Sequence, residues 1–171
     1  MALFGGNIED LRSLYVTQLQ YLLSTEKQIV DALPKMVDAA TDTRLKQALQ
    51  SHLQETKVHQ QRLEGALRSL TNSTSDKKCS VTAELIDSGE KTIKLSNDGP
   101  VRDVAIIAAA QKVEHFEIAS YGSARDWANL LGETEQSRLL QQTLDEEKHA
   151  DELLTTISQE RNVEAAKATA A

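Results

Sequence analysis

The stretch 143–151 carries residue types that can bind a metal ion. It contains Glu146-Glu147-Lys148-His149, a Glu-x-x-His motif. Because residues three apart on a helix share a face, the Glu146 carboxylate and a ring nitrogen of His149 can point at one spot. Such spacings also arise by chance on the solvated face of acidic helices. The motif therefore gains weight only if other segments supply matching groups.

The apolar residues around this motif predict which side of the helix faces the core. Their spacing is helical, and it predicts that Glu146 lies on the apolar stripe. A buried carboxylate without a partner is very costly, so a Glu146 that faces the core needs one. The apolar positions are Leu139, Leu140, Leu144, Ala150, Leu153, Leu154 and Ile157.

Three other segments also place acids or imidazoles where an apolar stripe predicts a hydrophobic side chain. The residues that interrupt the stripes are Glu26 in 8–40, His52, Glu55 and His59 in 42–70, and Glu114 and Glu117 in 100–131. Each has an ordinary explanation: Glu26 can pair with Lys27 at a helix edge, and the imidazoles can form an exposed polar patch. Four such interruptions near the middle of four segments favour one shared site.

The donor types indicate which ions such a site would hold. Four carboxylates (Glu26, Glu55, Glu114 and Glu146) balance the charge of two divalent ions, and two imidazoles add a nitrogen ligand for each. Carboxylate with imidazole suits iron or manganese, whereas calcium and magnesium would not require histidine. Glu55 and His59 are four apart rather than three, so His52 is kept as a reserve ligand. Glu117 adds a further carboxylate.

The elements that must position these residues are all helical. Glycine occurs 7 times and proline twice, while leucine, alanine, glutamine, glutamate and lysine are common. We predict an all-α bundle of four long helices (about 8–40, 42–70, 100–131 and 134–161), with Pro34 kinking or breaking the first. The connection between the second and third holds a short helix (81–95) and is long enough for one crossover. Residues 1–161 form one domain, and 162–171 are expected to be a disordered tail.

Charge and composition exclude several classes of protein. The net charge is −7 and the pI about 5.1, so neither nucleic acid nor a membrane surface is expected as a partner. The longest apolar run, 104–110, is too short to span a bilayer. The N-terminal residues lack the pattern of a signal peptide, and Cys79 is the only cysteine. These features predict a cytoplasmic protein.

Four segments together resemble the bacterial YciF family. They are Leu33-Pro-Lys-Met36, His52-Leu-Gln-Glu-Thr-Lys57, Gln111-Lys-Val-Glu-His-Phe-Glu-Ile-Ala-Ser-Tyr-Gly122 and Thr143-Leu-Asp-Glu-Glu-Lys-His149. The resemblance implies a ferritin-like fold close to the rubrerythrins, a di-metal centre, a homodimer and an association with stress responses. The family's metal positions map onto Glu26, Glu55, His59, Glu114, Glu117, Glu146 and His149.

Three functions follow from these observations. The first is a redox enzyme in which two ions, iron or manganese, act on peroxide or dioxygen as a peroxidase, catalase-like enzyme or ferroxidase. Because the chain has no Cys-x-x-Cys module, a partner protein would donate electrons to a peroxidase. The second is a metal-binding or sequestering stress protein without turnover. The third is an interaction protein whose acids pair with lysine or arginine. Tyr15, Tyr21 and Tyr121 are candidate redox groups or ordinary core residues.

Overall fold

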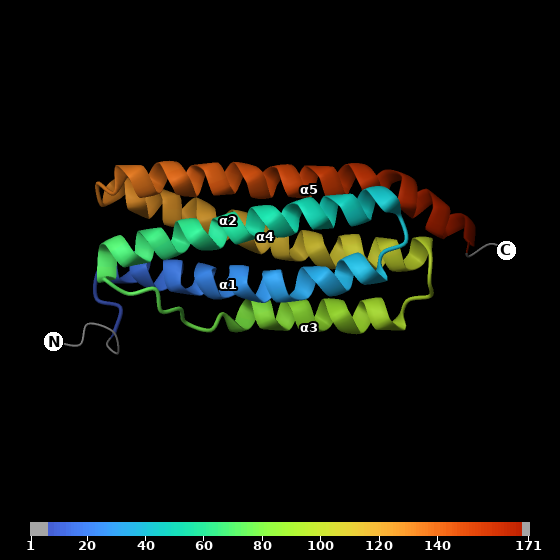
Figure 1. The fold of residues 1–171 in the computed structure, drawn as a ribbon, viewed down its shortest axis with the longest axis horizontal. Coiled ribbons are helices and arrows are strands. Elements are labelled where there is room, and N and C mark those ends of the chain that lie inside the picture. Colours follow the sequence, from blue (N-terminus) through green and yellow to red (C-terminus); the bar gives the residue numbers. More distant parts are fainter. Residues whose placement is uncertain (1–6, 169–171) are drawn as a thin grey trace.

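Five α-helices form the described part of the chain, residues 7–168, in a computed structural model. They are α1 (Leu11–Ala39), α2 (Thr43–Thr71), α3 (Ser80–Leu95), α4 (Pro100–Leu130) and α5 (Thr134–Ala168). All five lie with their axes roughly along the length of the molecule (Figure 1), and residues 7–168 contain no strand. The all-α prediction is confirmed. The expectation about a signal peptide falls partly on residues 1–6, outside the described range.

Local sequence signals explain where these helices begin. Asp10 caps α1 in a capping box with Ser13, and the Asp42 side chain accepts hydrogen bonds from the first backbone N–H groups of α2. Pro100 opens α4 directly after Gly99, whose φ of 95° favours glycine. Pro34 does not break α1, which continues to Ala39. Leu33 beside it is buried in the core.

The two long hairpins and the connection between them bring four mid-helix segments together. The pairs α1–α2 and α4–α5 make the most extensive helix contacts, and α3 packs against α4 and α1. Figure 1 shows α3 alongside α1, on the side away from α2. The predicted short helix within the long connection is therefore present.

The apolar core is divided into two clusters with polar residues between them. The first cluster includes Leu19 and Leu23 of α1, Leu63 and Leu67 of α2, Ala124 of α4 and Leu140 of α5. The second includes Ile29 and Leu33 of α1, Leu45 and Leu49 of α2, Ile106 of α4 and Leu154 of α5. On each long helix, the residues between these positions include the buried acids and imidazoles. Apolar packing thus closes the polar segment from both ends of the molecule.

The end of α5 differs from the prediction. We expected the helix to end near Arg161 and a disordered tail to follow, but α5 continues to Ala168, and residues 169–171 lie outside the described range. Arg161 holds the C-terminal part of α5 against α4, because its guanidinium lies 3.0 Å from Asp103. It also pairs with Glu164, one helical turn later. The alanines that follow favour a helix. Among residues 7–168, no helix is both long enough and apolar enough to cross a membrane.

Asp103 joins three elements at one end of the molecule. Its fully buried carboxylate accepts hydrogen bonds from the Thr41 and Asp42 backbone N–H groups and from the Thr41 hydroxyl, besides pairing with Arg161. Breaking a buried charged pair leaves the partner charge uncompensated.

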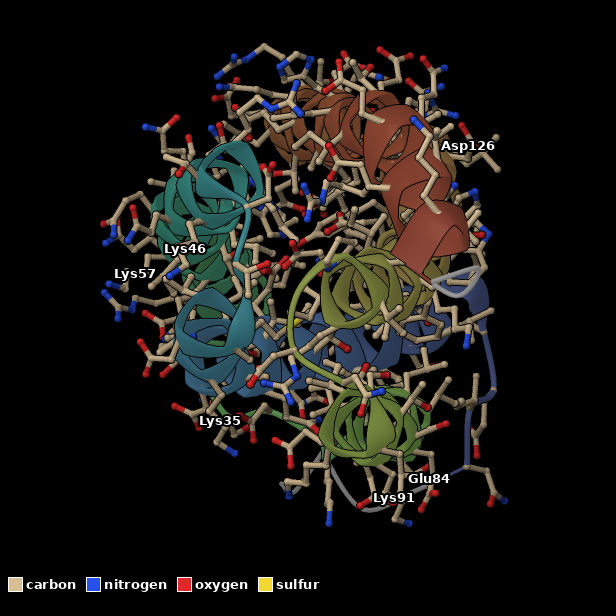
Figure 2. The ribbon with its side chains drawn as sticks, turned by 90° about the vertical axis from the view of Figure 1, so that its right-hand side faces the viewer. Lys35, Lys46, Lys57, Glu84, Lys91 and Asp126 are labelled. Atoms are coloured by element: carbon tan, nitrogen blue, oxygen red, sulfur yellow. The ribbon has the colours of Figure 1, made fainter. Side chains whose placement is uncertain are left out.

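We therefore expect Asp103→Ala to lower the free energy of unfolding by about 3 kcal/mol, or the Tm by roughly 6–12 °C. Asp126→Ala is the matched control on the same helix, because Asp126 lies at the surface (Figure 2) and pairs with the neighbouring Arg125. Thermal unfolding followed by circular dichroism measures both. Equal Tm values for the two variants would contradict the assigned role of Asp103.

Candidate metal centre

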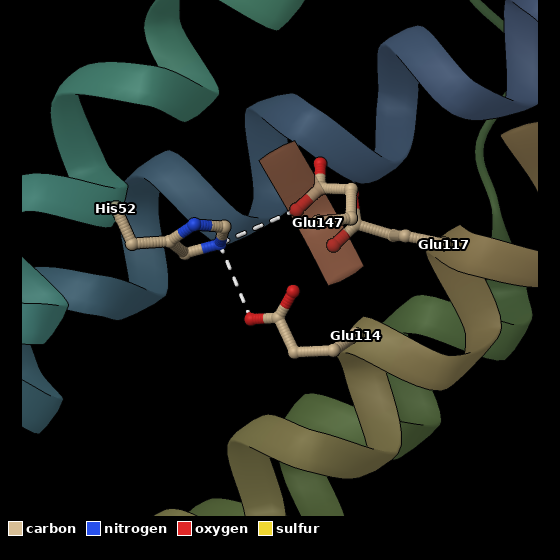
Figure 3. Close-up of side chains that lie close together, drawn as sticks. All are labelled: His52, Glu114, Glu117 and Glu147. Carbon is tan, nitrogen blue, oxygen red and sulfur yellow. Dashed lines mark ion pairs between the residues drawn. The ribbon is translucent and has the colours of Figure 1, made fainter. Parts of the chain in front are cut away.

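Six buried acids and imidazoles meet between the two apolar clusters. They form two overlapping groups, and the candidate ligand atoms within each group all lie within 4.8 Å of one another. One group is His52, Glu114, Glu117 and Glu147, drawn in Figure 3, and the other is Glu26, His59 and Glu147. All four long helices contribute, and Glu147 of α5 belongs to both groups.

The imidazoles connect the acids of different helices. His52 Nε2 lies 3.3 Å from Glu114 Oε1 and 4.0 Å from Glu147 Oε2, as the dashed lines in Figure 3 show. His59 Nδ1 lies 2.9 Å from Glu147 Oε1 and 3.8 Å from Glu26 Oε1, without the alignment of a hydrogen bond. Each imidazole therefore faces two carboxylates.

Many polar atoms in this cluster lack a hydrogen-bond partner. In the described residues, ten buried side-chain nitrogen and oxygen atoms have none, and eight of them belong to these six residues. The eight include both carboxylate oxygens of Glu117 and of Glu147. Buried polar groups are ordinarily hydrogen-bonded, so a concentration of unpartnered ones needs an explanation. Cations bound by the oxygens and ring nitrogens would satisfy them.

Burial and mutual repulsion make the carboxyl groups hold protons tightly. Burial, together with the charge of Glu147, raises the pKa of Glu26 to about 8. Burial also raises the pKa of Glu114 to about 8, although the facing His52 opposes the shift. The pKa of Glu117 is raised well above its ordinary value, first by burial and then by the charges of Glu147 and Glu26. Without cations, protons must neutralise this cluster.

The pKa values of the two histidines are raised, whereas burial alone would lower them. Burial would lower the pKa of His52, but the facing carboxylates, Glu114 first among them, raise it to about 10. Burial likewise opposes protonation of His59, but contact with Glu147 and Glu26 raises its pKa to about 8. The whole cluster is therefore strongly attractive to positive charge.

The donor set could hold a metal ion. Carboxylate oxygens and imidazole nitrogens are both common metal ligands in proteins. No lysine or arginine among residues 7–168 lies within ion-pair distance of Glu26, Glu114, Glu117 or Glu147. This argues against the reading in which the acids merely pair with basic side chains.

The structure brings together some of the residues singled out in the sequence and leaves others at the edge. Glu26, His59, Glu114 and Glu117 lie in the cluster, and so does His52, the reserve ligand. Glu55 is half exposed, with its carboxylate 3.8 Å from His52 Nδ1. Its pKa is lowered, mainly by His52.

The expected orientation of Glu146 and His149 is wrong. Glu147, which was not among the predicted ligands, occupies the buried position instead, while Glu146 is half buried and His149 is exposed. The buried positions on this part of α5 are Leu140, Thr143, Leu144, Glu147, Ala150, Leu154 and Ile157. Leu139 and Leu153, which had been placed on the stripe, are not buried, and omitting them moves the centre of the face to Glu147. Glu147 lies seven residues after Leu140, three after Leu144 and three before Ala150, and these helical spacings were the signal that could have identified it.

Glu146 instead supports the cluster from outside. Arg62 donates hydrogen bonds of 2.5 and 3.1 Å to its two carboxylate oxygens, and Glu146 Oε2 lies 2.8 Å from His59 Nε2. Although partial burial opposes the shift, Arg62 and His59 lower the pKa of Glu146 to about 2. This arrangement fixes the His59 ring with Nδ1 toward Glu147.

The tyrosines have different environments. The Tyr121 hydroxyl donates a short hydrogen bond to Glu26 Oε1, and its ring meets His59 edge-on at 6.4 Å between centroids. Burial, followed by the Glu26 charge, raises the pKa of Tyr121 well above its ordinary value, so it stays protonated as a donor. Tyr15 donates to Gln136 in the core, and Tyr21 is partly exposed. Tyr121 therefore belongs to the cluster's immediate surroundings.

Comparisons with known proteins give one consistent result. Residues 10–167 match the family described as "Domain of unknown function (DUF892)". Protein YciF of Escherichia coli strain K12 is 37% identical over 153 residues, which cover 89% of this chain and 92% of that protein.

Three solved structures have a fold similar to that of this chain. The E. coli stress protein YciF matches with a TM-score of 0.86 at 36% identity, covering 90% of this chain and 98% of that one. YcfI from Rhodopseudomonas palustris matches with the same TM-score and coverage at 38% identity. A protein from Xanthomonas campestris, at 20% identity and a TM-score of 0.76, covers 95% of this chain and 100% of that one and shares the fold.

Glu147→Gln tests the centre of the cluster. The substitution keeps the side-chain size but removes the carboxylate shared by both groups, so we expect the bound metal to fall by at least half. His149→Ala should leave metal content unchanged, because His149 is exposed and lies outside both groups. Elemental analysis of purified protein, with circular dichroism as a check on folding, measures both. Metal loss in the His149 variant alone would contradict the assigned positions.

The pKa shifts predict how the stability of metal-free protein depends on pH. Glu26 and Glu114 titrate near 4.5 when unfolded and near 8 when folded, so between these values the folded chain holds more protons and rising pH favours unfolding. His52 and His59, also raised, act in the same direction above about pH 6.5. Glu146 acts in the opposite direction, because its pKa is lowered in the folded state. Its contribution to the free energy of unfolding is lost as pH falls from about 4.5 toward 2.

We expect the Tm of chelator-treated protein to fall by about 5 °C or more between about pH 5.5 and 8.5. Added manganous ion should raise the Tm more at the higher pH, because the ligands must be deprotonated to bind it. Thermal unfolding with and without metal measures this. A Tm that rises with pH in the metal-free protein would contradict the burial of these acids as neutral groups.

Proposed function

This chain belongs to the DUF892 family, and on that basis we propose that it is a ferritin-like protein that holds two iron or manganese ions and uses them for redox chemistry on peroxide or dioxygen during stress. One observation carries the proposal. Eight polar atoms without a hydrogen-bond partner, which belong to four buried carboxylates and two imidazoles, lie together between two apolar clusters. Buried carboxylates in this number need either protons or cations to offset their charge, and bound cations would also satisfy the oxygen and nitrogen atoms that lack hydrogen bonds.

The proposed ligands divide naturally between two ions. Glu26 and His59 would serve one, His52, Glu114 and Glu117 would serve the other, and Glu147 would be shared. Two hairpins of long helices joined by a connection with its own helix are the arrangement that such carboxylate-bridged bundles use. Iron or manganese bound here would supply two-electron exchange with an oxygen oxidant.

The surrounding residues of the chain would orient the ligands and exclude water. Tyr121 holds one oxygen of Glu26, which leaves the other oxygen, Oε2, free for an ion. Arg62 and Glu146 hold His59 at Nε2, which leaves Nδ1 free. The apolar clusters on either side keep bulk water from both ends of the site. Support of this kind keeps a metal site in one geometry.

The biological setting of the proposal comes from relatives. The E. coli relative is described as a stress protein, which supports a protective role for this chain as well. Because the sequence contains a single cysteine and no Cys-x-x-Cys module, a reductive reaction would need electrons from a partner protein. A homodimer and a cytoplasmic location also belong to the proposal, on the resemblance to that family.

A second candidate is a metal-binding protein without turnover. The ions would then act as structural ties between α1, α2, α4 and α5, whose acids would otherwise repel one another. The relative from R. palustris is described, provisionally, as a structural protein, which favours this alternative. The two candidates differ in whether the bound metal reacts with an oxidant.

Metal content and an ultraviolet–visible spectrum distinguish them. Untagged protein should contain about two iron or manganese ions per chain, and its spectrum should change on addition of hydrogen peroxide. Bound metal that does not respond to peroxide would favour the structural role. Absence of metal even after reconstitution with ferrous or manganous ion would contradict both. Tyr121→Phe is a useful variant, since it should keep the metal but alter the peroxide response.

A further inference from the structure

A large apolar cavity lies beside the acidic cluster, between α1, α3 and α4. Its volume is about 290 Å³, and its walls are formed by side chains such as Leu33, Met36, Ile86, Ile93, Ala110 and Val113. An apolar cavity of about 150 Å³ holds one benzene molecule, so this one has room for roughly ten to twelve carbon atoms. Protein interiors rarely leave space of this size unfilled.

The cavity cannot close by a simple inward shift of α3. At Gly89 this helix is already so near α4 that an added Cβ would lie 2.9 Å from Cβ of Ala109. Gly89 itself borders the cavity. The space beside this contact is therefore a fixed feature of the packing.

The two ends of the cavity have different charge. Two lysines, Lys35 of α1 and Lys94 of α3, border it at the surface together with one acid, Glu90. Both lysines are largely exposed, and Lys35 lies 2.8 Å from Glu90 while Lys94 lies 3.8 Å from it. The mouth thus carries an excess positive charge.

The inner end reaches the acidic cluster. His52 and Glu114 both line the cavity there, and both are at least nine-tenths buried. Each has a polar atom without a hydrogen-bond partner: Nδ1 of His52 and Oε2 of Glu114. The inner end offers one carboxylate and one imidazole that already face each other at 3.3 Å, whereas the mouth offers two exposed lysines. An anionic group therefore finds its counter-charge at the mouth, where it also keeps its hydration.

From this geometry we infer that the cavity binds a single-chain aliphatic carboxylate of about ten carbons, with its tail inside and its carboxylate at Lys35 and Lys94. The tail would end near His52 and Glu114, so the chain would approach the acidic cluster without adding charge to it. This inference goes beyond the proposed redox function and holds whether or not the cluster contains metal.

A chain-length series tests the size of the cavity. Isothermal titration calorimetry of the metal-loaded full-length protein with hexanoate, octanoate, decanoate and dodecanoate should show one site per chain. Affinity should rise about three- to fourfold per methylene up to about decanoate and then level off, because further carbons stay outside. Ala32→Leu, which fills part of the cavity from α1, should shift the levelling point to a shorter chain without lowering the Tm.

Substitution of the two lysines at the mouth tests the orientation of the bound carboxylate. Lys35→Gln/Lys94→Gln should weaken decanoate binding roughly tenfold, because the attraction of two largely exposed ammonium groups for the carboxylate is lost. Lys91→Gln is the matched control on α3, since Lys91 pairs with Asp87 and does not border the cavity; it should change affinity less than about twofold. Figure 2 shows Lys91 on the outer side of α3. Decanol should bind more weakly than decanoate.

Several results would overturn the inference. They are no saturable binding of decanoate, an unchanged chain-length profile in Ala32→Leu, or equal effects of the mouth and control lysine variants. If decanoate fails to bind and Ala32→Leu dissociates a dimer in sedimentation analysis, the cavity is instead filled by a second copy of the chain. Repeating the titration on metal-free protein separates this inference from the metal proposal, because decanoate should bind in both forms.

Discussion

Burial of four carboxylates at one level of a helical bundle is the constraint on which the rest of this structure depends. Glu26, Glu114, Glu117 and Glu147 are almost wholly inaccessible to solvent and lie close enough to repel one another. Their repulsion can be relieved only by protons or by cations. The positions of His52 and His59, each between two of these acids, are the first part of that compensation.

The distribution of apolar residues makes such a site tolerable. Packing in the two flanking clusters stabilises each of the four long helices on both sides of its polar turn. Groups outside the cluster then hold the ligands in position: Tyr121 holds Glu26, and Arg62 with Glu146 holds His59. The outcome is a polar centre between two apolar clusters, with its side chains oriented by hydrogen bonds from outside.

The cavity makes the two sides of the acidic cluster different in polarity. On the side of α3 an apolar space with lysines at its mouth reaches the acidic cluster, whereas on the side between α2 and α5 the rim is polar and formed by residues such as Glu55, Glu146 and His149. Small polar species and aliphatic chains would therefore approach the cluster from different directions. α3, the short helix of the long connection, creates this difference.

The sequence by itself determined the helical class, the approximate extent of the first four helices and the residues of α1 and α4 that reach the centre, together with His59 of α2. Helical periodicity is strong in long segments, and Glu26, His59, Glu114 and Glu117 each interrupt a clear leucine or isoleucine stripe. On α5 the pattern was ambiguous by one residue, because Leu139 and Leu153 widen the apolar stripe. Only the packing of α5 against α4 and α2 decided that Glu147 faces inward and His149 outward. The inclusion of both His52 and His59, the outer role of Glu146 and the cavity beside α3 were likewise decided by tertiary structure, since each depends on distances between helices that spacing along one chain does not contain.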